Sequence, residues 1–299
     1  MSMERVKGFV ETPEQRKVSL KPDVVLNRGV QGLGWVVLVA WLVFTIVTIL
    51  WLVASSLKSN QQFFGSPFKL PSPLVPSNYS QAWSVSNMGD YFMRSVGIDV
   101  LATAVAVALS IPAAYVLSRS TLNLSRWIVN GFAVGIGIPI QIALVPLYVA
   151  LSWTNLVNSM MGLGLVYVGM TIPLTVFLLT GFLSTVPTEL EEAARVDGAS
   201  FMGTLFRIIV PTARSGIATA FIVGIVGLWN EFIVAYTVLT TQTKFTLPVG
   251  LYSLYGSLQY TSDWTGLMAA FIITTFPILI AFAILSRHII SGLTLGVER

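Results

Sequence analysis

A carboxylate next to an indole and an amide is the side-chain combination with the clearest binding chemistry in this chain. Trp229, Asn230 and Glu231 follow one another inside a long apolar run. An indole can stack on a sugar ring, and an amide and a carboxylate can bind its hydroxyl groups, so a substrate contact is one interpretation. An acid in an apolar span is costly without a polar partner, so the favoured interpretation is that Glu231 locks helices together.

Asp99 is the second carboxylate that falls within an apolar run. By the same argument, it should face a polar partner, water or the interior of a helix bundle. It also lies five residues after Arg94, near the start of its run, so it could instead lie at the membrane boundary or pair with that arginine. Asp99 is therefore a candidate pathway residue with two simpler alternatives.

Residue types that enzymes need for covalent or metal chemistry are scarce. The chain has no cysteine and a single histidine, which excludes disulfides, thiolate metal sites and histidine-containing metal clusters. That histidine, His288, follows Arg287 near the end of an apolar run and is interpreted as a solvated cation. No Gly-x-x-x-x-Gly-Lys-Ser/Thr phosphate loop is present, so any ATP hydrolysis must come from another chain. We predict no catalytic residue, no metal site and no cofactor.

The composition indicates which elements must position these residues. Of the 299 residues, 55% are hydrophobic and 10% are charged, and the mean hydropathy is +0.79, whereas a globular domain usually carries about a quarter charged residues. Runs long enough to cross a hydrocarbon core of about 30 Å recur along the chain. An all-α membrane protein is therefore predicted, with six spans at residues 33–57, 93–117, 127–151, 159–183, 216–239 and 266–285.

The positions of lysine and arginine predict the orientation of these spans. They are scattered beside apolar runs and form no basic groove with interleaved aromatic residues, so nucleic acid is not an expected partner. Short cytoplasmic segments retain Lys and Arg, and most of the 17 basic residues fall on the side that holds both termini. We expect a cytoplasmic N-terminal tail (1–32), a six-span domain (33–290) and a cytoplasmic C-terminal tail (291–299). Within the domain, residues 58–92 should be external and residues 185–215 cytoplasmic.

Several predicted spans contain residues that interrupt helices. A proline leaves a backbone carbonyl without its usual partner, which is tolerated where neighbouring helices or a water-filled path can satisfy it. One interpretation is ordinary kinks and close packing through small residues, and the other is a bundle that bends around a pathway. The interrupting residues are Pro112, Pro139, Pro146, Pro173, Pro277 and the glycines between positions 131 and 137.

The predicted cytoplasmic loop contains a long internal run rich in both acidic and basic residues, from Glu191 to Pro211. Thr188 and Glu191 match the Ser/Thr-x-x-Glu capping box, which predicts a helix start, and Gly198 predicts the helix end. Ser200 can cap a second helix, which Pro211 would close.

The second helix should carry an apolar stripe on one face, formed by Phe201, Leu205, Ile208 and Ile209. The resulting hairpin is too short to form its own core, so the stripe must dock against something. One possibility is a hairpin that lies on the membrane face of this protein. The other is docking against a partner.

A longer pattern covers the same loop: Glu-Ala-Ala, three residues, Gly, nine residues, Ile, one residue, a hydrophobic residue and Pro. It resembles the signature loop of permease subunits in binding-protein-dependent ABC importers, with Val210 where that family commonly has leucine. The resemblance implies that the loop seats in a cleft of a cytoplasmic ATPase subunit and couples ATP-driven closure to opening of the pore. The implied coupling residues are Glu191, Glu192, Ala193, Ala194, Asp197, Gly198 and Pro211.

Four further segments resemble carbohydrate permeases of the maltose type: AAYVLSR (113–119), WNEF (229–232), TLPVGL (246–251) and SGLTLG (291–296). The resemblance implies the type I ABC importer permease fold and the smaller, six-span subunit, in the cell membrane of a prokaryote. It also implies a second permease in a heterodimer, two ATPase subunits, an external solute-binding protein, a carbohydrate substrate and surrounding lipid. The last five residues depart from the family ending, which weakens the expectation that this tail contacts the ATPases.

Three alternatives to a carbohydrate importer remain open. An importer of the same type could carry a non-sugar solute such as a glycerol phosphate derivative. A stand-alone secondary transporter would use Glu231 and Asp99 as coupling acids. A membrane enzyme would need a nucleophile or metal cluster and is disfavoured by the composition. In maltose-type importers the main sugar pocket can lie in the other permease, and Glu231 would then lock the paired permeases together.

Overall fold

The computed structural model describes residues 28–294, apart from the side chains of residues 28–31, 258, 259, 261 and 284–294. The chain divides into two compact units, Met1–Leu50 and Trp51–Arg299. In the first unit the described part is helical and belongs to α1 (Arg28–Ser56), and its large apolar side chains are exposed. The predictions for most of the N-terminal tail, the last five residues and the His288 side chain lie outside what is described.

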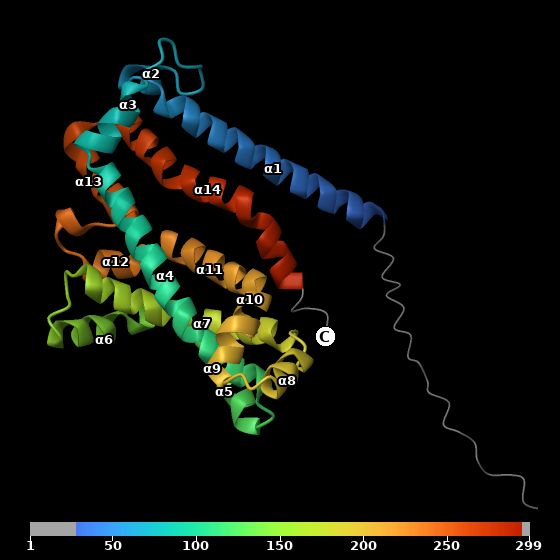
Figure 1. Cartoon of the computed structure of the whole chain (residues 1–299). Coiled ribbons are helices and arrows are strands. Elements are labelled where there is room, and N and C mark those ends of the chain that lie inside the picture. The colour runs from blue at the N-terminus through green and yellow to red at the C-terminus, as the bar shows by residue number, and fades with distance from the viewer. Residues whose placement is uncertain (1–27, 295–299) are drawn as a thin grey trace, which may run out of the picture. The chain divides into compact units, whose positions relative to one another are not determined.

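All regular elements within residues 28–294 are helical, as the composition predicts. Figure 1 labels most of them in chain order. After α1 they are α2 (Asn60–Gly65), α3 (Ser77–Ser80), η1 (Gln81–Val85), α4 (Met88–Arg119), α5 (Asn123–Ile136), α6 (Ile140–Trp153), α7 (Met160–Ser184), α8 (Glu189–Val196), α9 (Phe201–Thr204), η2 (Leu205–Ile209), α10 (Val210–Thr212), α11 (Arg214–Trp229), α12 (Ile233–Val238), η3 (Gln242–Lys244), α13 (Leu247–Thr261) and α14 (Trp264–Thr294).

Four described helical segments are long and apolar enough to cross a membrane: Gly32–Ser56, Met88–Arg119, Met160–Ser184 and Trp264–Ala283. Two helix pairs also qualify, but each is sharply bent, by 95° between α5 and α6 and by 76° between Phe201–Thr212 and α11. The count reaches six when each bent pair is one span. The described residues therefore hold four to six candidate spans, and the second bent pair includes residues 201–212, which the sequence analysis places in the cytoplasmic loop.

The third predicted span, 127–151, is a pair of helices instead of one. α5 ends at Ile136 and α6 begins at Ile140, with Pro139 preceding the first turn at φ −63° and ψ 125°. Proline has no N–H and disfavours helical geometry at the residue before it, so a helix end before Ile138 is favoured. Pro112 and Pro146 lie inside helices, which shows that position in the run, and not proline alone, decides the break.

The predicted fifth span, 216–239, is also interrupted. α11 ends at Trp229, and α12 begins at Ile233 after a short break. The Glu231 carboxylate accepts hydrogen bonds from the backbone N–H groups of Val234 (2.7 Å) and Ala235 (3.1 Å). An acidic side chain on the free N–H groups of a helix start stabilises a new beginning, so Glu231 favours the break.

α4 and α7 share the most extensive contact and form the centre of the second unit, with α11 packed against both. Gly224 of α11 makes this packing close: a Cβ at that position would lie 2.7 Å from the Thr103 side chain and 3.2 Å from that of Thr171. Small residues at helix crossings let membrane helices approach in this way. Figure 1 shows α3 and α13 near one end of α4 and α8 and α9 near the other.

The segment predicted as an external loop, 58–92, holds short helices tied together by polar contacts. Lys58 is buried, and its Nζ donates hydrogen bonds to the carbonyls of Pro67 (2.6 Å) and Ser66 (3.3 Å). Burial lowers the pKa of the Lys58 ammonium group. Asn78 Nδ2 donates to the carbonyls of Ser56 and Lys58, both at 2.8 Å. This segment is consequently anchored to the end of α1.

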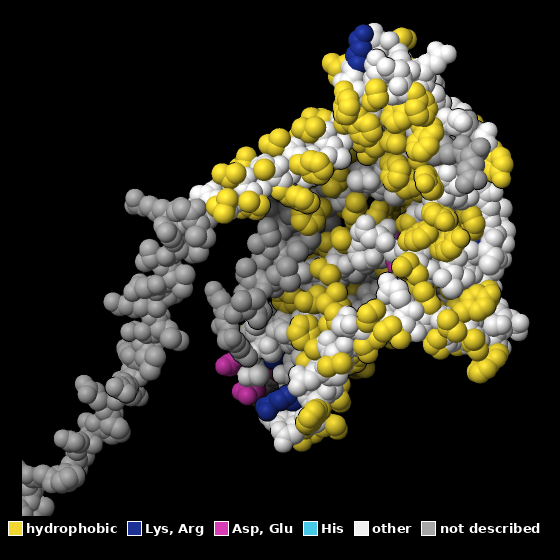
Figure 2. All heavy atoms as spheres, turned by 180° about the vertical axis from the view of Figure 1, so that it is seen from behind, with side chains coloured by type: hydrophobic (Ala, Val, Ile, Leu, Met, Phe, Trp, Pro, Cys, Tyr) yellow, Lys and Arg dark blue, Asp and Glu magenta, His cyan; other side chains and the backbone are white. Residues whose placement is uncertain are grey.

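The surface carries the pattern expected of a protein in lipid. On the face in Figure 2, hydrophobic side chains cover much of the second unit, while most of the charged ones visible lie near its two ends. Large exposed apolar residues include Trp127 at 75% and Trp153 at 83% of their surface. Exposed apolar area of this extent is unusual for a soluble monomer and is accounted for by contact with lipid or another subunit.

Candidate functional site

The charged loop folds as the two short helices that its sequence predicts. Gly198 has φ +79°, the left-handed conformation that ends a helix and that glycine adopts without strain. Ser200 caps α9 by accepting a hydrogen bond from the Gly203 N–H at 3.2 Å. The predicted capping box at Thr188 is wrong, because Thr188 is helical and its side chain makes no capping bond. The Glu191 carboxylate is engaged elsewhere.

Glu191 is held by two residues of α4. The Arg119 Nε donates to Glu191 Oε1 at 2.6 Å, and the Tyr115 hydroxyl donates to Oε2 at 2.9 Å. Arg119 also donates to the carbonyl of Leu183 at 2.9 Å and to that of Val186 at 3.0 Å. One guanidinium thus connects the end of α4, the end of α7 and the beginning of α8, and Glu191 is only 4% exposed.

The apolar stripe of the second helix packs on this chain's own helices. Leu205 and Ile209 are fully buried in a cluster with Leu179 and Leu183 of α7. Phe201 is exposed over half its surface but lies against the Tyr115 ring, with centroids 5.3 Å apart. The alternative of docking within the same protein therefore holds for most of the stripe.

The helical run does not close at Pro211. Pro211 lies in the first turn of α10, which continues to Thr212, and the chain bends before α11. Proline is well tolerated there because the N–H groups of a first helical turn lack intrahelical partners. The bend between this run and α11 lies at Ala213 instead.

The predicted coupling residues fall into two groups, one buried and one exposed. Glu191 and Ala194 are buried against α4 and its neighbours. Glu192, Ala193, Asp197, Gly198 and Pro211 are exposed, and Val196 beside them is 88% exposed. The loop thus presents a mixed surface of acidic, basic and apolar side chains, with Arg195 and Arg207 also exposed, on a base held in place by Arg119.

Glu231 joins two helices of this chain. Besides the two N–H groups of α12, its Oε2 accepts a hydrogen bond from the Tyr167 hydroxyl of α7 at 2.9 Å. Glu231 therefore locks α7 to α12 within this chain, and the lock between two paired permeases that the sequence favours stays a prediction. Neither carboxylate oxygen is without a partner, since Oε1 is bound by the Val234 N–H.

Asp99 is buried inside α4. It is 2% exposed, and its Oδ2 has no hydrogen-bond partner among the described residues. The suggested pairing with Arg94 is wrong: Arg94 lies 3.6 Å from Asp90 and over the Tyr91 ring. Its placement at the membrane boundary stays a prediction, because α4 begins at Met88 and is longer than a span requires.

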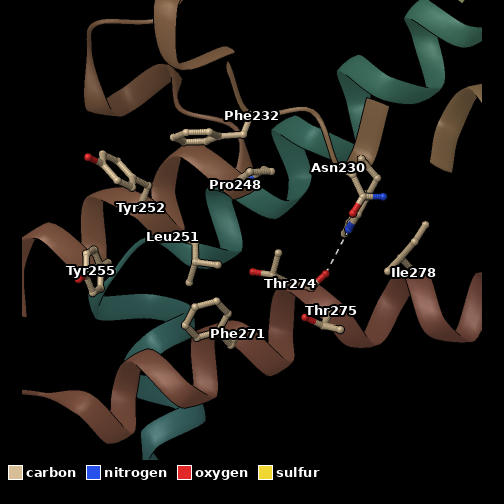
Figure 3. Close-up of a pocket in the computed structure, with 11 residues that line it drawn as sticks. Asn230, Phe232, Pro248, Leu251, Tyr252, Tyr255, Phe271, Thr274, Thr275 and Ile278 are labelled. Carbon is tan, nitrogen blue, oxygen red and sulfur yellow. Dashed lines mark hydrogen bonds between the residues drawn. The ribbon is translucent and has the colours of Figure 1, made fainter. Parts of the chain in front are cut away.

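Trp229 and Asn230 line a cavity of about 520 Å³, whereas Glu231 is not among its lining residues. Figure 3 shows side chains from α13 and α14 around it, with Phe232 close to Tyr252. Their ring centroids are 5.3 Å apart. The dashed line in Figure 3 is the hydrogen bond from Trp229 Nε1 to the Thr274 carbonyl at 3.1 Å. Within the WNEF segment, Trp229, Asn230 and Phe232 therefore line the cavity, whereas Glu231 holds two helices together.

The sequence analysis missed Arg119, Tyr115 and Tyr167 as site residues. Arg119 and Tyr115 belong to the AAYVLSR segment and are four residues apart, so they lie on one face of a helix. This spacing could have indicated that the two side chains act together at one site. Tyr167 carries no local signal, because its role depends on the position of Glu231 on another helix.

Residues 106–294 match the family of binding-protein-dependent transport system inner membrane components. The matched segment contains the loop, Arg119 and the cavity residues described above. The chain belongs to this family.

The relatives of this permease support the same conclusion. It is 34% identical over 273 residues to the diacetylchitobiose uptake system permease protein NgcG of Streptomyces coelicolor, covering 91% of this chain and 90% of the relative. It is 30% identical to the trehalose transport system permease protein SugB of Mycobacterium tuberculosis, covering 88% and 96%. It is 31% identical to the sulfoquinovosyl glycerol transport system permease protein SmoH of Agrobacterium fabrum, covering 83% and 86%.

A solved structure has the same fold. A chain of a bacterial ABC transporter involved in the import of the acidic polysaccharide alginate matches with a TM-score of 0.74 and 19% identity, covering 88% of this permease and 97% of that chain. The fold is the type I ABC importer permease fold.

This chain is a multi-pass transmembrane permease subunit of an ABC importer and not an enzyme. The family implies a partner ATPase, which is a separate subunit, and a solute-binding protein. A second permease is usual in such importers.

Proposed function

We propose that this permease forms half of the translocation pathway of an ATP-driven carbohydrate importer in a prokaryotic cell membrane. Its partners would be one other permease in a heterodimer, two ATPase subunits and an external solute-binding protein. The names of the relatives support a carbohydrate, since they transport diacetylchitobiose, trehalose or a sulfoquinovosyl glycerol. The glycerol conjugate in that set keeps a glycerol phosphate derivative as the second candidate substrate.

The observation that supports the coupling role is that two adjacent acidic side chains, Glu191 and Glu192, face in opposite directions. Glu191 points inward and binds Arg119, while Glu192 is exposed on the outer face of α8. An ATPase cleft that grips the outer face would move α8, and the Arg119 contacts would pass that movement to α4 and α7 as a rigid-body shift. The loop would therefore act as a lever with its pivot at Arg119.

The orientation follows from this role. An ATPase is cytoplasmic, so a loop that docks on it must be cytoplasmic as well, in agreement with the distribution of Lys and Arg. Both termini would then be cytoplasmic, and the segment 58–92, near the opposite end of α4, would be external. Labelling of a residue in the N-terminal or the C-terminal tail from outside intact cells would contradict this assignment.

The cavity beside Trp229 is our candidate for the part of the pathway formed by this subunit. Phe232, Tyr252 and Tyr255 offer aromatic faces, and Asn230 and Thr275 offer hydrogen-bonding groups. Aromatic rings combined with a few polar groups suit the apolar faces and hydroxyl groups of a sugar. Glu231 and Asp99 would support the helices around the cavity without touching the solute.

Reconstitution of the purified complex tests the proposal. The permease is purified together with its partner subunits and placed in proteoliposomes with the binding protein outside and ATP inside. We expect uptake of a labelled sugar that requires both ATP and the binding protein. Uptake driven by a proton gradient in vesicles that contain this permease alone would overturn the proposal in favour of a secondary transporter. Competition by glycerol 3-phosphate, without competition by any sugar, would favour the second candidate substrate.

A further inference from the structure

The cavity beside Trp229 has walls without charge. The described residues that line it include no lysine, arginine, aspartate or glutamate. They come from the end of α11, from the break between α11 and α12, and from α13 and α14, which Figure 3 shows around the cavity. A solute in this cavity therefore meets aromatic rings, aliphatic side chains and neutral polar groups of this subunit.

The charged residues closest in sequence are engaged elsewhere. Glu231 is not among the lining residues, and its two oxygens accept hydrogen bonds from N–H groups of α12 and from the Tyr167 hydroxyl. Lys244, in the connection between α12 and α13, donates from Nζ to the Asn158 carbonyl at 2.6 Å and does not line the cavity either. Neither residue supplies a charge to the cavity wall.

An anion would be poorly held in such a cavity. It would lose part of its hydration without gaining a cation from the described residues that form the wall, and this loss is far larger for a charged group than for a neutral hydroxyl. The fold itself does not exclude an anion, since the solved transporter chain with this fold belongs to a system involved in the import of the acidic polysaccharide alginate. Selection by charge would therefore come from the side chains of the cavity.

The groups that the cavity offers can be reached by a solute and suit an uncharged sugar. Tyr252 and Tyr255 are 49% and 53% exposed. Their hydroxyl groups and that of Thr275 make no hydrogen bond to another described residue. A sugar ring can place its C–H face on an aromatic ring while its hydroxyl groups bond to neutral polar groups of this kind.

We propose that this cavity is a charge filter, which admits an uncharged saccharide and disfavours a sugar or glycerol derivative that carries a phosphate. The inference rests on the proposed carbohydrate transport, and it favours the uncharged candidate substrate over the glycerol phosphate derivative. Thr275 of α14 and Tyr255 of α13 line the cavity from two different helices and provide the positions at which the filter is tested.

The absence of cysteine allows a site-specific test. Thr275→Cys places the only thiol of the chain in the cavity, and Thr240→Cys places it in the exposed connection after α12, outside the lining. Each variant is assembled into the full complex and treated with a membrane-impermeant thiol reagent, and labelling of this subunit is measured. We expect trehalose or diacetylchitobiose to slow labelling at position 275 and not at position 240. The 6-phosphate of the same sugar should need a more than tenfold higher concentration, which corresponds to more than about 1.4 kcal/mol.

Tyr255→Lys supplies the missing cation, and Tyr255→Gln is the matched variant that removes the same ring without adding a charge. Each is combined with Thr275→Cys. The lysine should lower the concentration of the sugar 6-phosphate for half-protection at least tenfold relative to the glutamine, and added salt should reduce this difference. The uncharged sugar should protect both variants equally. Equal protection of the two variants by the sugar 6-phosphate would overturn the charge filter.

ATP-dependent uptake of the same compounds by the otherwise unaltered complex separates this inference from the proposed function. Uptake of an uncharged sugar without protection at position 275, or without any labelling there while position 240 is labelled, would overturn the filter and leave the proposed function intact. Uptake of the sugar 6-phosphate as fast as that of its parent sugar would do the same. Uptake of glycerol 3-phosphate without uptake of any sugar would overturn both.

Discussion

Arg119 Nε lies 2.6 Å from Glu191 Oε1, and this contact joins a membrane helix to the loop that we propose couples it to the ATPase. Both side chains are largely buried: 18% of the Arg119 side chain and 5% of the Glu191 side chain is exposed. The remaining guanidinium N–H groups bind the carbonyls that end α7 and begin the loop. Arg119 thus connects three elements through its side chain, so the pair is a natural target for mutagenesis.

Arg119→Ala should impair both assembly and transport. The substitution leaves the Glu191 carboxylate buried without its cation and frees two carbonyls, which costs about 3–5 kcal/mol when a buried pair is broken. Thermal unfolding of the purified complex and ATP-dependent uptake measure the two effects. Arg126→Ala is the matched control, since Arg126 is exposed and makes no ion pair with a described residue. Equal behaviour of the two variants would show that the pair has no special role.

Glu192→Ala should leave stability unchanged and weaken coupling. Glu192 is exposed on the outer face of α8, so its loss would remove the proposed contact with the ATPase and no contact within the described chain. We expect uptake per ATP hydrolysed to fall about tenfold, the effect of roughly 1.4 kcal/mol of interface energy. Glu191→Ala is the comparison, and it should lower the unfolding temperature. A drop in the unfolding temperature of Glu192→Ala would contradict the outward placement.

Substitutions of Gly198 should follow the backbone geometry. At φ +79° asparagine is tolerated, alanine costs about 1–2 kcal/mol, and proline cannot adopt the conformation because its φ is close to −65°. The expected order of transport activity is therefore Gly, Asn, Ala and Pro. Gly198→Pro should still insert into the membrane while ATP hydrolysis proceeds without uptake. Normal uptake by Gly198→Pro would show that transport does not need the left-handed turn at this residue.

Glu231→Gln should weaken the junction between α7 and α12 without altering substrate preference. The neutral amide keeps one acceptor but loses the charge that favours the N–H groups of α12. Tyr167→Phe removes the other half of the contact, and a double-mutant cycle on unfolding should show coupling of about 0.5–3 kcal/mol. Substrate preference is measured separately, by competition between sugars for uptake. A shift in sugar preference would instead assign Glu231 to the pathway.

Much of the loop was predictable because its signals are local. Gly198 and Ser200 act through the conformation of their own backbone and the next few residues, and both behave as expected. The capping box at Thr188 failed because Arg119, distant in sequence, competes for the Glu191 carboxylate. A charged guanidinium is a stronger partner for a buried carboxylate than a backbone N–H.

The sequence by itself determined the class of protein, the approximate positions of the apolar spans and the identity of the loop, since each follows from composition or from a contiguous pattern. Only the tertiary structure decided which acid of the pair Glu191 and Glu192 faces inward, which partner Glu231 binds, and that Trp229 lines a cavity that Glu231 does not. These outcomes depend on how helices pack side by side. Packing brings together residues far apart in the chain, and no local periodicity records which of them will meet.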